Sequence, residues 1–60
     1  MSSELISVMV VDDSAIVRGL LTRALEMDDQ IRVVASAMHG QAALQALKRE
    51  SVDVLLLDVE

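Results

Sequence analysis

Three short apolar segments, separated by two stretches with helical periodicity, are the feature that most narrows the folds open to this chain. The segments are residues 6–11 (ISVMVV), 31–35 (IRVVA) and 52–57 (VDVLLL). Nearly continuous apolar runs of this length, rich in β-branched residues, are typical of buried strands. Helical crossovers between such strands imply parallel pairing with right-handed connections. The sequence therefore predicts an α/β fold in the order β-α-β-α-β.

Both predicted helices carry an apolar stripe. In residues 15–27 the apolar positions recur at steps of three and four, the period of a helix. They are Ile16, Val17, Leu20, Leu21, Ala24 and Leu25. Residues 41–50 (QAALQALKRE) have high helix propensity, and their stripe is Ala43, Leu44 and Leu47. The pattern leaves open whether the two helices cover opposite faces of the sheet or the same face.

Polar segments mark the ends of these elements. Asp12-Asp13-Ser14 follows the first strand and contains residue types that cap helices. Residues 36–40 are predicted to form the loop before the second helix. His39 in this loop is expected to be solvated, because loops expose polar groups. Arg18 and Arg23 are expected on the solvated face of the first helix.

Composition excludes several classes of protein. The net charge is −5, whereas a nucleic-acid binder carries a basic stripe. The chain has no cysteine, which excludes disulfides and thiolate metal sites. No segment reaches the roughly 18 apolar residues that span a bilayer, and the polar start lacks the basic region of a signal peptide. We therefore expect a cytoplasmic protein with one domain over residues 1–60, frayed at residues 1–4, with neither nucleic acid nor membrane as partner.

The short chain predicts marginal stability for a monomer. A compact protein of this mass exposes about 3,800 Å² when folded and about 9,400 Å² when extended. If about 60% of the difference is apolar, burial contributes about 85 kcal/mol at about 25 cal/mol per Å² of apolar surface. Ordering the chain costs about 90 kcal/mol, and the sequence has no Phe, Trp or Tyr to bury more area. A second copy or another partner would tip this balance.

Three acidic side chains follow two of the predicted strands. Asp12 and Asp13 come after the first strand and Asp58 after the third. Ligands bind at the carboxyl ends of parallel strands, so the three carboxylates converge if these strands are neighbours. Like charges repel unless a cation joins them, and carboxylate oxygens suit Mg²⁺ or Mn²⁺. One carboxylate is then a candidate nucleophile that takes a phosphoryl group as an acyl phosphate.

A plainer interpretation stays open beside this one. An Asp-Asp-Ser cluster after a strand is often only a helix start, because acids are favoured at the positive end of the helix dipole. Asp58 on its own is often a solvated strand end. Both plain interpretations weaken when the two acidic sites end separate strands of one β-α-β-α-β unit.

Three segments resemble the CheY-like receiver family of response regulators. VVDDSAIVR is similar to the family's first strand and acidic pair, VVASAMHGQAALQAL to its second strand and second helix, and VDVLLLDVE to its phosphoacceptor strand. The resemblance covers the chain from Ile6 onward. The Asp-Val-Glu ending is similar to chemotaxis methylesterase receivers in particular.

The resemblance implies a phosphorelay module of two-component signalling. Asp12 and Asp13 would be the Mg²⁺ carboxylates, and a histidine kinase or a small phosphodonor would phosphorylate Asp58. The family also uses a main-chain carbonyl as a metal ligand, and that position is Glu60 here. The implied fold is flavodoxin-like and doubly wound, with the first three strands in the order 2-1-3.

Several features of the family pattern are absent from this sequence. The fourth and fifth strands are missing, together with the Ser or Thr and the Lys that contact the phosphoryl group. The Met-Pro and Gly that usually follow the phosphoacceptor are missing too. The resemblance therefore does not imply efficient phosphorylation or the family's usual switch.

Without a fourth strand, the third strand becomes an edge of the sheet. Its sequence is almost uncharged, and unpaired edges of this kind recruit other strands. We therefore predict a symmetric homodimer in which two third strands pair antiparallel and complete the sheet, an arrangement that closes on itself. The predicted interface residues are Val52, Val54, Leu55, Leu56 and Leu57. Swapped and helix-mediated dimers remain alternatives.

Two classes of function follow from these observations. The first is the phosphorelay receiver. The second is an interaction module that dimerises, or pairs with other receivers, without phosphotransfer. A nucleotide-binding unit is disfavoured, because DDSAIVRG follows the first strand where G-x-G-x-x-G is needed. We expect no catalysis on an external substrate, since the sequence shows no base and nucleophile pair.

Overall fold

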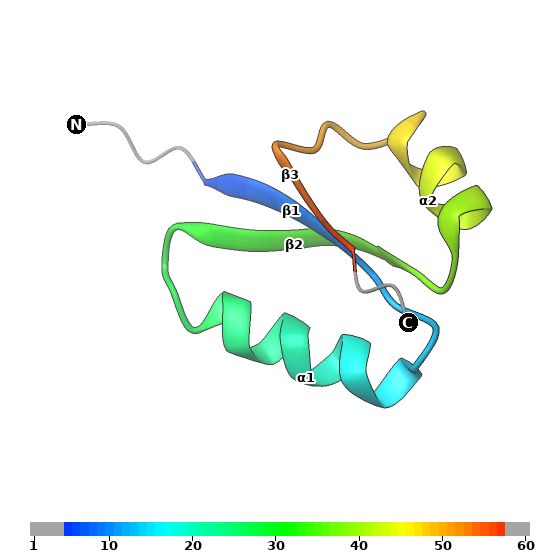
Figure 1. The fold of residues 1–60 in the computed structure, drawn as a ribbon. Helices are drawn as coiled ribbons and strands as arrows, with labels where there is room; N and C mark the ends of the chain where they lie inside the picture. Colours follow the sequence, from blue (N-terminus) through cyan, green and yellow to red (C-terminus); the bar gives the residue numbers. More distant parts are fainter. Residues whose placement is uncertain (1–4, 58–60) are drawn as a thin grey trace.

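The computed structural model describes residues 5–57 and contains three strands and two helices (Figure 1). In chain order they are β1 (Ile6–Val11), α1 (Ala15–Glu26), β2 (Ile31–Ala37), α2 (Gly40–Leu47) and β3 (Val54–Leu57). The predicted order of elements is confirmed. Within the described range, neither helix is long and apolar enough to cross a membrane.

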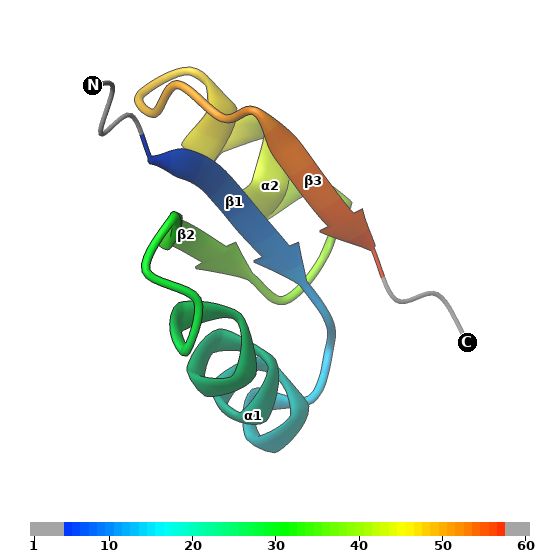
Figure 2. The same cartoon turned by 90° about the vertical axis from the view of Figure 1, so that its left-hand side faces the viewer.

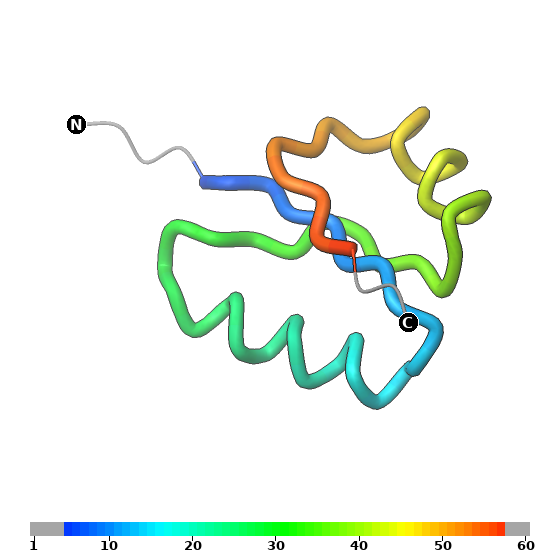
Figure 3. Tube along the Cα trace, in the orientation of Figure 1, coloured from blue at the N-terminus to red at the C-terminus, as the bar shows by residue number. Residues whose placement is uncertain are grey.

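The three strands form one parallel sheet in the order β2-β1-β3. This is the predicted half of a CheY-like fold, with β1 at the centre. Val8 pairs with Val33 and Met9 with Ala35, so that a bulge at Val34 interrupts the β1–β2 ladder. The chain leaves β1 through α1 to reach β2, and leaves β2 through α2 to reach β3 (Figure 3).

The helices lie on opposite faces of the sheet (Figures 1 and 2), which decides the question that the sequence left open. Both helices pack on β1 and β2. The buried core on the α2 side consists of Met9, Val11, Ala37, Ala43 and Ala46. Because alternate residues of a strand face opposite sides, the buried Val8 and Val10 of β1 lie on the α1 side.

The boundaries around the second loop differ from the prediction. β2 continues to Ala37 and α2 begins at Gly40, so the predicted loop of residues 36–40 shrinks to Met38 and His39. The strand is prolonged because the Asp12 N–H donates to the Ala37 carbonyl at 3.0 Å. The helix begins early because His39 caps it, its Nδ1 accepting from the Ala42 N–H at 3.1 Å. At its other end α2 stops at Leu47, before the predicted residue 50.

The expectation of a buried third strand is wrong for this chain. β3 spans four residues, and all four are exposed, with exposed fractions from 37% at Leu56 to 56% at Leu57. Among the described elements, β3 packs only against β1, and neither helix covers it. The chain exposes 4560 Å², against about 3,800 Å² for a compact protein of this mass.

The apolar stripe of α1 is only partly used. Val17, Leu21 and Leu25 are half-buried, whereas Ile16 and Leu20 are 77% and 60% exposed. The helix covers β1 and β2, so the part of its stripe that has no strand or helix opposite remains in solvent. Exposed apolar side chains of the described residues thus lie on β3 and on both helices.

Candidate functional site

The acidic turn between β1 and α1 is held close to the sheet. Asp12 is only 4% exposed, and among the described residues it is the one buried residue with a charged side chain. Asp13, the next residue, is exposed. The Asp12 N–H donates to the Ala37 carbonyl at 3.0 Å, which ties the turn to the end of β2. The Asp12 Oδ1 accepts from the Ser14 N–H at 2.8 Å. The turn therefore presents one buried and one exposed carboxylate in sequence.

Within the Asp12-Asp13-Ser14 cluster that was predicted to cap a helix, Ser14 is the residue that caps α1. Its side-chain oxygen accepts from the Val17 N–H at 3.2 Å, and its carbonyl accepts from the Arg18 N–H at 2.9 Å. A serine at this position satisfies an N–H group that the helix itself leaves without an acceptor. The acidic pair consequently lies at the positive end of the α1 dipole, which favours negative charge there.

Arg18 is a member of the site that the sequence analysis missed. The expectation of a solvated position is wrong, because Arg18 is half-buried and its Nη1 donates to the Asp12 carbonyl at 2.7 Å. Six residues of separation place the side chain where it reaches back along the helix to the turn. Arg23 is exposed, as expected. The helical spacing shows on which side of α1 Arg18 lies, but it does not show that the Asp12 carbonyl lies within reach of this side chain.

The ends of β1 and β3 lie side by side. Val11 pairs with Leu57 in the parallel ladder, so the last residues of the two strands are neighbours. The other end of this ladder is held by Asp53, whose N–H donates to the Ser7 carbonyl at 2.8 Å and whose Oδ2 accepts from the Ser7 N–H at 2.9 Å. These two bonds fix the register at the start of β3.

Two of the predicted site residues, Asp58 and Glu60, lie outside the described residues. In the sequence Asp58 directly follows Leu57. The predicted interface residue Val52 is half-buried and precedes β3. It packs against the core of the α2 side, because the chain enters β3 over that face.

The donor chemistry of the turn fits a hard divalent cation. Asp12 and Asp13 supply carboxylate oxygens, the ligands that Mg²⁺ prefers in proteins. Within residues 5–57, no three or more His, Cys, Asp or Glu side chains gather closely enough to hold a metal ion. Asp58, the third carboxylate that the sequence analysis predicts for this site, lies beyond this range.

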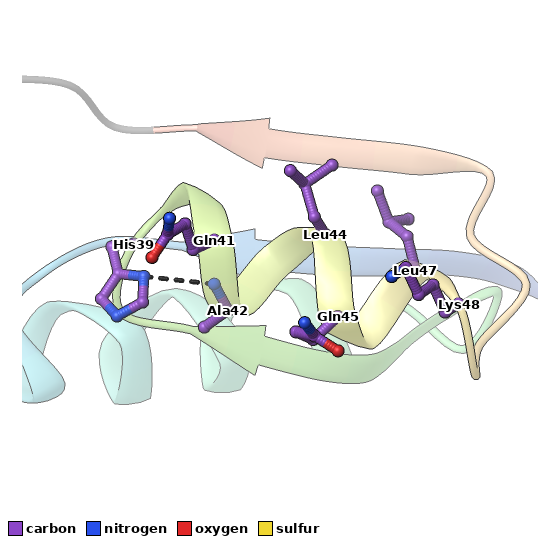
Figure 4. A pocket seen from close by; sticks show the side chains of 7 residues that line it. All are labelled: His39, Gln41, Ala42, Leu44, Gln45, Leu47 and Lys48. Atoms are coloured by element: carbon purple, nitrogen blue, oxygen red, sulfur yellow. Dashed lines mark hydrogen bonds between the residues drawn. The ribbon is translucent and has the colours of Figure 1, made fainter.

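A hollow of the described surface runs along α2 (Figure 4). Leu44 and Leu47 extend from α2 toward the side on which β3 lies. His39 lies at the beginning of α2. The residues that line this hollow are His39, Gln41, Ala42, Leu44, Gln45, Leu47 and Lys48. His39 is used as a helix cap, a role that its solvated-loop interpretation did not include.

The comparisons with known proteins agree on one family. The model of the response regulator receiver domain matches residues 8–60. A protein-glutamate methylesterase/protein-glutamine glutaminase of Azospirillum brasilense is 66% identical over 55 residues, which cover 92% of this chain and 14% of that protein. A protein of the same description from Rhodospirillum rubrum is 62% identical over 55 residues, covering 92% of this chain and 14% of that protein.

A third relative, from Paramagnetospirillum magneticum and with the same description, is 54% identical over 59 residues, covering 98% of this chain and 16% of that protein. The chain thus spans about one seventh of the length of the curated relatives that it matches. No solved structure matches the chain. The predicted similarity to methylesterase receivers is confirmed by these relatives.

Proposed function

Because the chain belongs to the response regulator receiver domain family, we propose that it accepts a phosphoryl group on Asp58, with a divalent cation held by Asp12 and Asp13. The phosphoryl donor would be the phosphohistidine of a histidine kinase or a small acyl phosphate. The main-chain carbonyl of Glu60 is the proposed further ligand of the cation, which is Mg²⁺ or Mn²⁺.

The pairing of Val11 with Leu57 is the observation that carries this proposal. Asp12 follows Val11 in the sequence and Asp58 follows Leu57. Strands that end side by side in a parallel sheet direct the residues that follow them to the same edge. The register therefore supports a shared site for the carboxylates of Asp12 and Asp58, which are 46 residues apart in the sequence.

The proposed chemistry is a transfer between two phosphoryl acceptors. A carboxylate oxygen of Asp58 attacks phosphorus, and a new P–O bond forms while the P–N bond of the phosphohistidine breaks. The released imidazole nitrogen keeps the bonding electron pair and takes a proton from solvent. When bound, the cation neutralises charge on the phosphoryl oxygens. Asp12 and Asp13 would hold the cation, on a turn that Ala37 and Ser14 anchor.

Intact-mass analysis after incubation with Mg²⁺ and acetyl phosphate tests the proposal. We expect a phosphoryl adduct on the wild-type chain and none on Asp58→Asn. Asp29→Asn is the matched control, because Asp29 is an exposed acid on the α1–β2 turn and should leave the adduct unchanged. A folded wild-type sample that takes no adduct would contradict the proposal.

We propose no hydrolytic role for the chain, although its relatives are described as methylesterases and glutaminases. A hydrolase of this kind needs a nucleophile hydrogen-bonded to a base. Ser14 and His39 are the obvious residue types, but each is used as the cap of a different helix. We infer that the activity named for the relatives depends on parts of those proteins that this chain does not match.

A second function, as a dimerising interaction module, is favoured by the exposure of β3. Four apolar residues without charge form an open edge that neither helix of the described chain covers. We propose that β3 pairs with β3 of a second copy, or with an edge strand of another receiver. In the antiparallel dimer, the two Asp58 positions lie at opposite ends of the new sheet, so each copy keeps its own site.

Sedimentation equilibrium at micromolar concentration separates the two states. We expect the mass of a dimer. A monomer that remains folded under these conditions would contradict the interaction proposal without touching the phosphoacceptor proposal. Dimerisation by itself is compatible with phosphorylation of Asp58, and the phosphoryl adduct and the sedimentation mass test the two proposals separately.

A further inference from the structure

Arg18 joins α1 to the acidic turn at two points. Its main-chain N–H donates to the Ser14 carbonyl at 2.9 Å, as the first bond of the helix. Its side chain extends back and donates from Nη1 to the Asp12 carbonyl at 2.7 Å. The side chain is half-buried, and such a short bond from a charged donor is among the stronger kinds of hydrogen bond in proteins.

The carbonyl that Arg18 contacts belongs to the peptide group between Asp12 and Asp13. A peptide group is planar and rigid, so holding its oxygen also sets the direction in which Asp13 leaves the turn. The other groups of Asp12 are held as well, the N–H by Ala37 and Oδ1 by the Ser14 N–H. Arg18 supplies the contact that links the orientation of one carboxylate to that of the other.

We propose that Arg18 is a positioning residue, which sets the mutual orientation of the Asp12 and Asp13 carboxylates toward a divalent cation. This proposal rests on the proposed function, because it assumes that the acidic turn binds a cation. It adds a residue of α1 to the site and couples the start of this helix to the geometry of the ligands. Groups that orient metal ligands without touching the metal affect metal affinity strongly.

The sign of the effect distinguishes positioning from simple electrostatics. A guanidinium beside a cation site repels the cation, so an arginine that acted only through its charge would weaken cation binding. Removing that charge would then tighten binding. Removing a positioning contact has the opposite effect, because the two carboxylates no longer hold one arrangement.

The experiment compares Arg18→Gln, Arg18→Lys and Arg23→Gln with the wild-type chain. Arg23→Gln removes the same charge from an exposed position of the same helix, which makes it the matched control. Binding of Mn²⁺ is measured by electron paramagnetic resonance, since the chain has no Trp or Tyr for fluorescence. Circular dichroism of each variant verifies that the fold is retained.

We expect Arg18→Gln to bind Mn²⁺ about 10-fold more weakly than the wild type, and Arg23→Gln to remain within about twofold, because exposed charges are screened. Arg18→Lys should recover part of the loss, since it keeps a charged donor on a long side chain. Amide NMR shifts caused by Arg18→Gln should concentrate at Asp12, Asp13 and Ser14.

Four results would overturn the proposal. Equal or tighter Mn²⁺ binding by Arg18→Gln would assign Arg18 a purely electrostatic or structural role and leave the proposed function standing. An equal loss in Arg23→Gln would do the same. Absence of Mn²⁺ binding by the folded wild-type chain would reject both proposals together. If Arg18→Gln does not fold, Arg18→Lys decides: wild-type Mn²⁺ affinity together with shifted amide signals at Asp12, Asp13 and Ser14 would contradict the proposal, because the contact would be altered without a change in cation binding.

Discussion

The two edges of the sheet are built in opposite ways. At the β2 edge, both helices pack over the strand, and Glu26 of α1 accepts the Val33 N–H at 3.0 Å. The bulge at Val34 interrupts the ladder there, and Arg32 places a charge on the strand. At the β3 edge, four uncharged apolar residues are exposed and no described helix lies over them.

This difference shows which edge is available for pairing. Charges, bulges and covering elements are the means by which proteins prevent unwanted strand pairing, and the β2 edge has all three. Among the described residues, the acid next to β3 is Asp53, and its side chain and N–H bond inward to Ser7 of β1. A new strand can therefore add next to β3 far more readily than next to β2.

A cavity in β1, the strand that lies between the two edge strands, should have the largest effect on stability. Met9 of β1 is fully buried at the centre of the sheet. Met9→Ala should lower the free energy of unfolding by about 3 kcal/mol, because it removes buried apolar surface and leaves a cavity. Chemical denaturation followed by circular dichroism measures this loss. Met27→Ala, at an 84% exposed position, is the control and should change little.

A charge on the open edge should break the proposed dimer. Leu56→Lys places two like charges near each other in the paired β3 strands, which should weaken association by about 2 kcal/mol, or roughly 30-fold. Sedimentation equilibrium measures the dimer dissociation constant. Ser36→Lys puts the same charge on an exposed position of β2 and should leave association unchanged. If both variants weakened the dimer equally, the contrast between the edges would be wrong.

Removing the cap of α1 should lower the stability of this helix and increase amide exchange in β2, a strand on which it packs. Ser14→Ala removes the acceptor of the Val17 N–H and should cost about 1 kcal/mol of unfolding free energy. Because α1 also carries Glu26, amide exchange in β2 should accelerate more than exchange in the β1–β3 ladder. Ser51→Ala, at an exposed position after α2, serves as the control. Uniform acceleration throughout the sheet would argue against a local role for α1.

The smallest effect should come from removing the Glu26 side chain, which accepts a hydrogen bond at the β2 edge. Glu26→Ala deprives the Val33 N–H of its acceptor, and because this bond is exposed we expect a loss of only about 0.5 kcal/mol. Faster amide exchange at Val33, with other amides of the sheet unchanged, is the direct readout. Glu50→Ala removes an exposed acid elsewhere and should not alter Val33. An unchanged exchange rate at Val33 would show that the edge is protected by the helices and the bulge alone.

Local sequence was sufficient to predict the type and order of every element. The alternation of apolar runs and helical stripes identified the strands and helices, and β1 spans residues 6–11 as predicted. That the Asp12-Asp13-Ser14 cluster can cap a helix followed from its residue types and position, and the structure identifies Ser14 as the cap. The placement of Asp12 and Asp13 at the end of β1 needed only the knowledge of where this strand stops.

The tertiary structure alone decided which residues meet across the chain. Asp53 and Ser7 are separated by 46 positions, and no periodicity within either segment indicates that they pair. The same holds for the contact of Arg18 with Asp12, for Glu26 on the β2 edge and for the covering of opposite faces by α1 and α2. Element type depends on the spacing of neighbours along the chain, which the sequence contains directly. Which edge is guarded and which is open depends on contacts between distant segments, and these exist only once the sheet has formed.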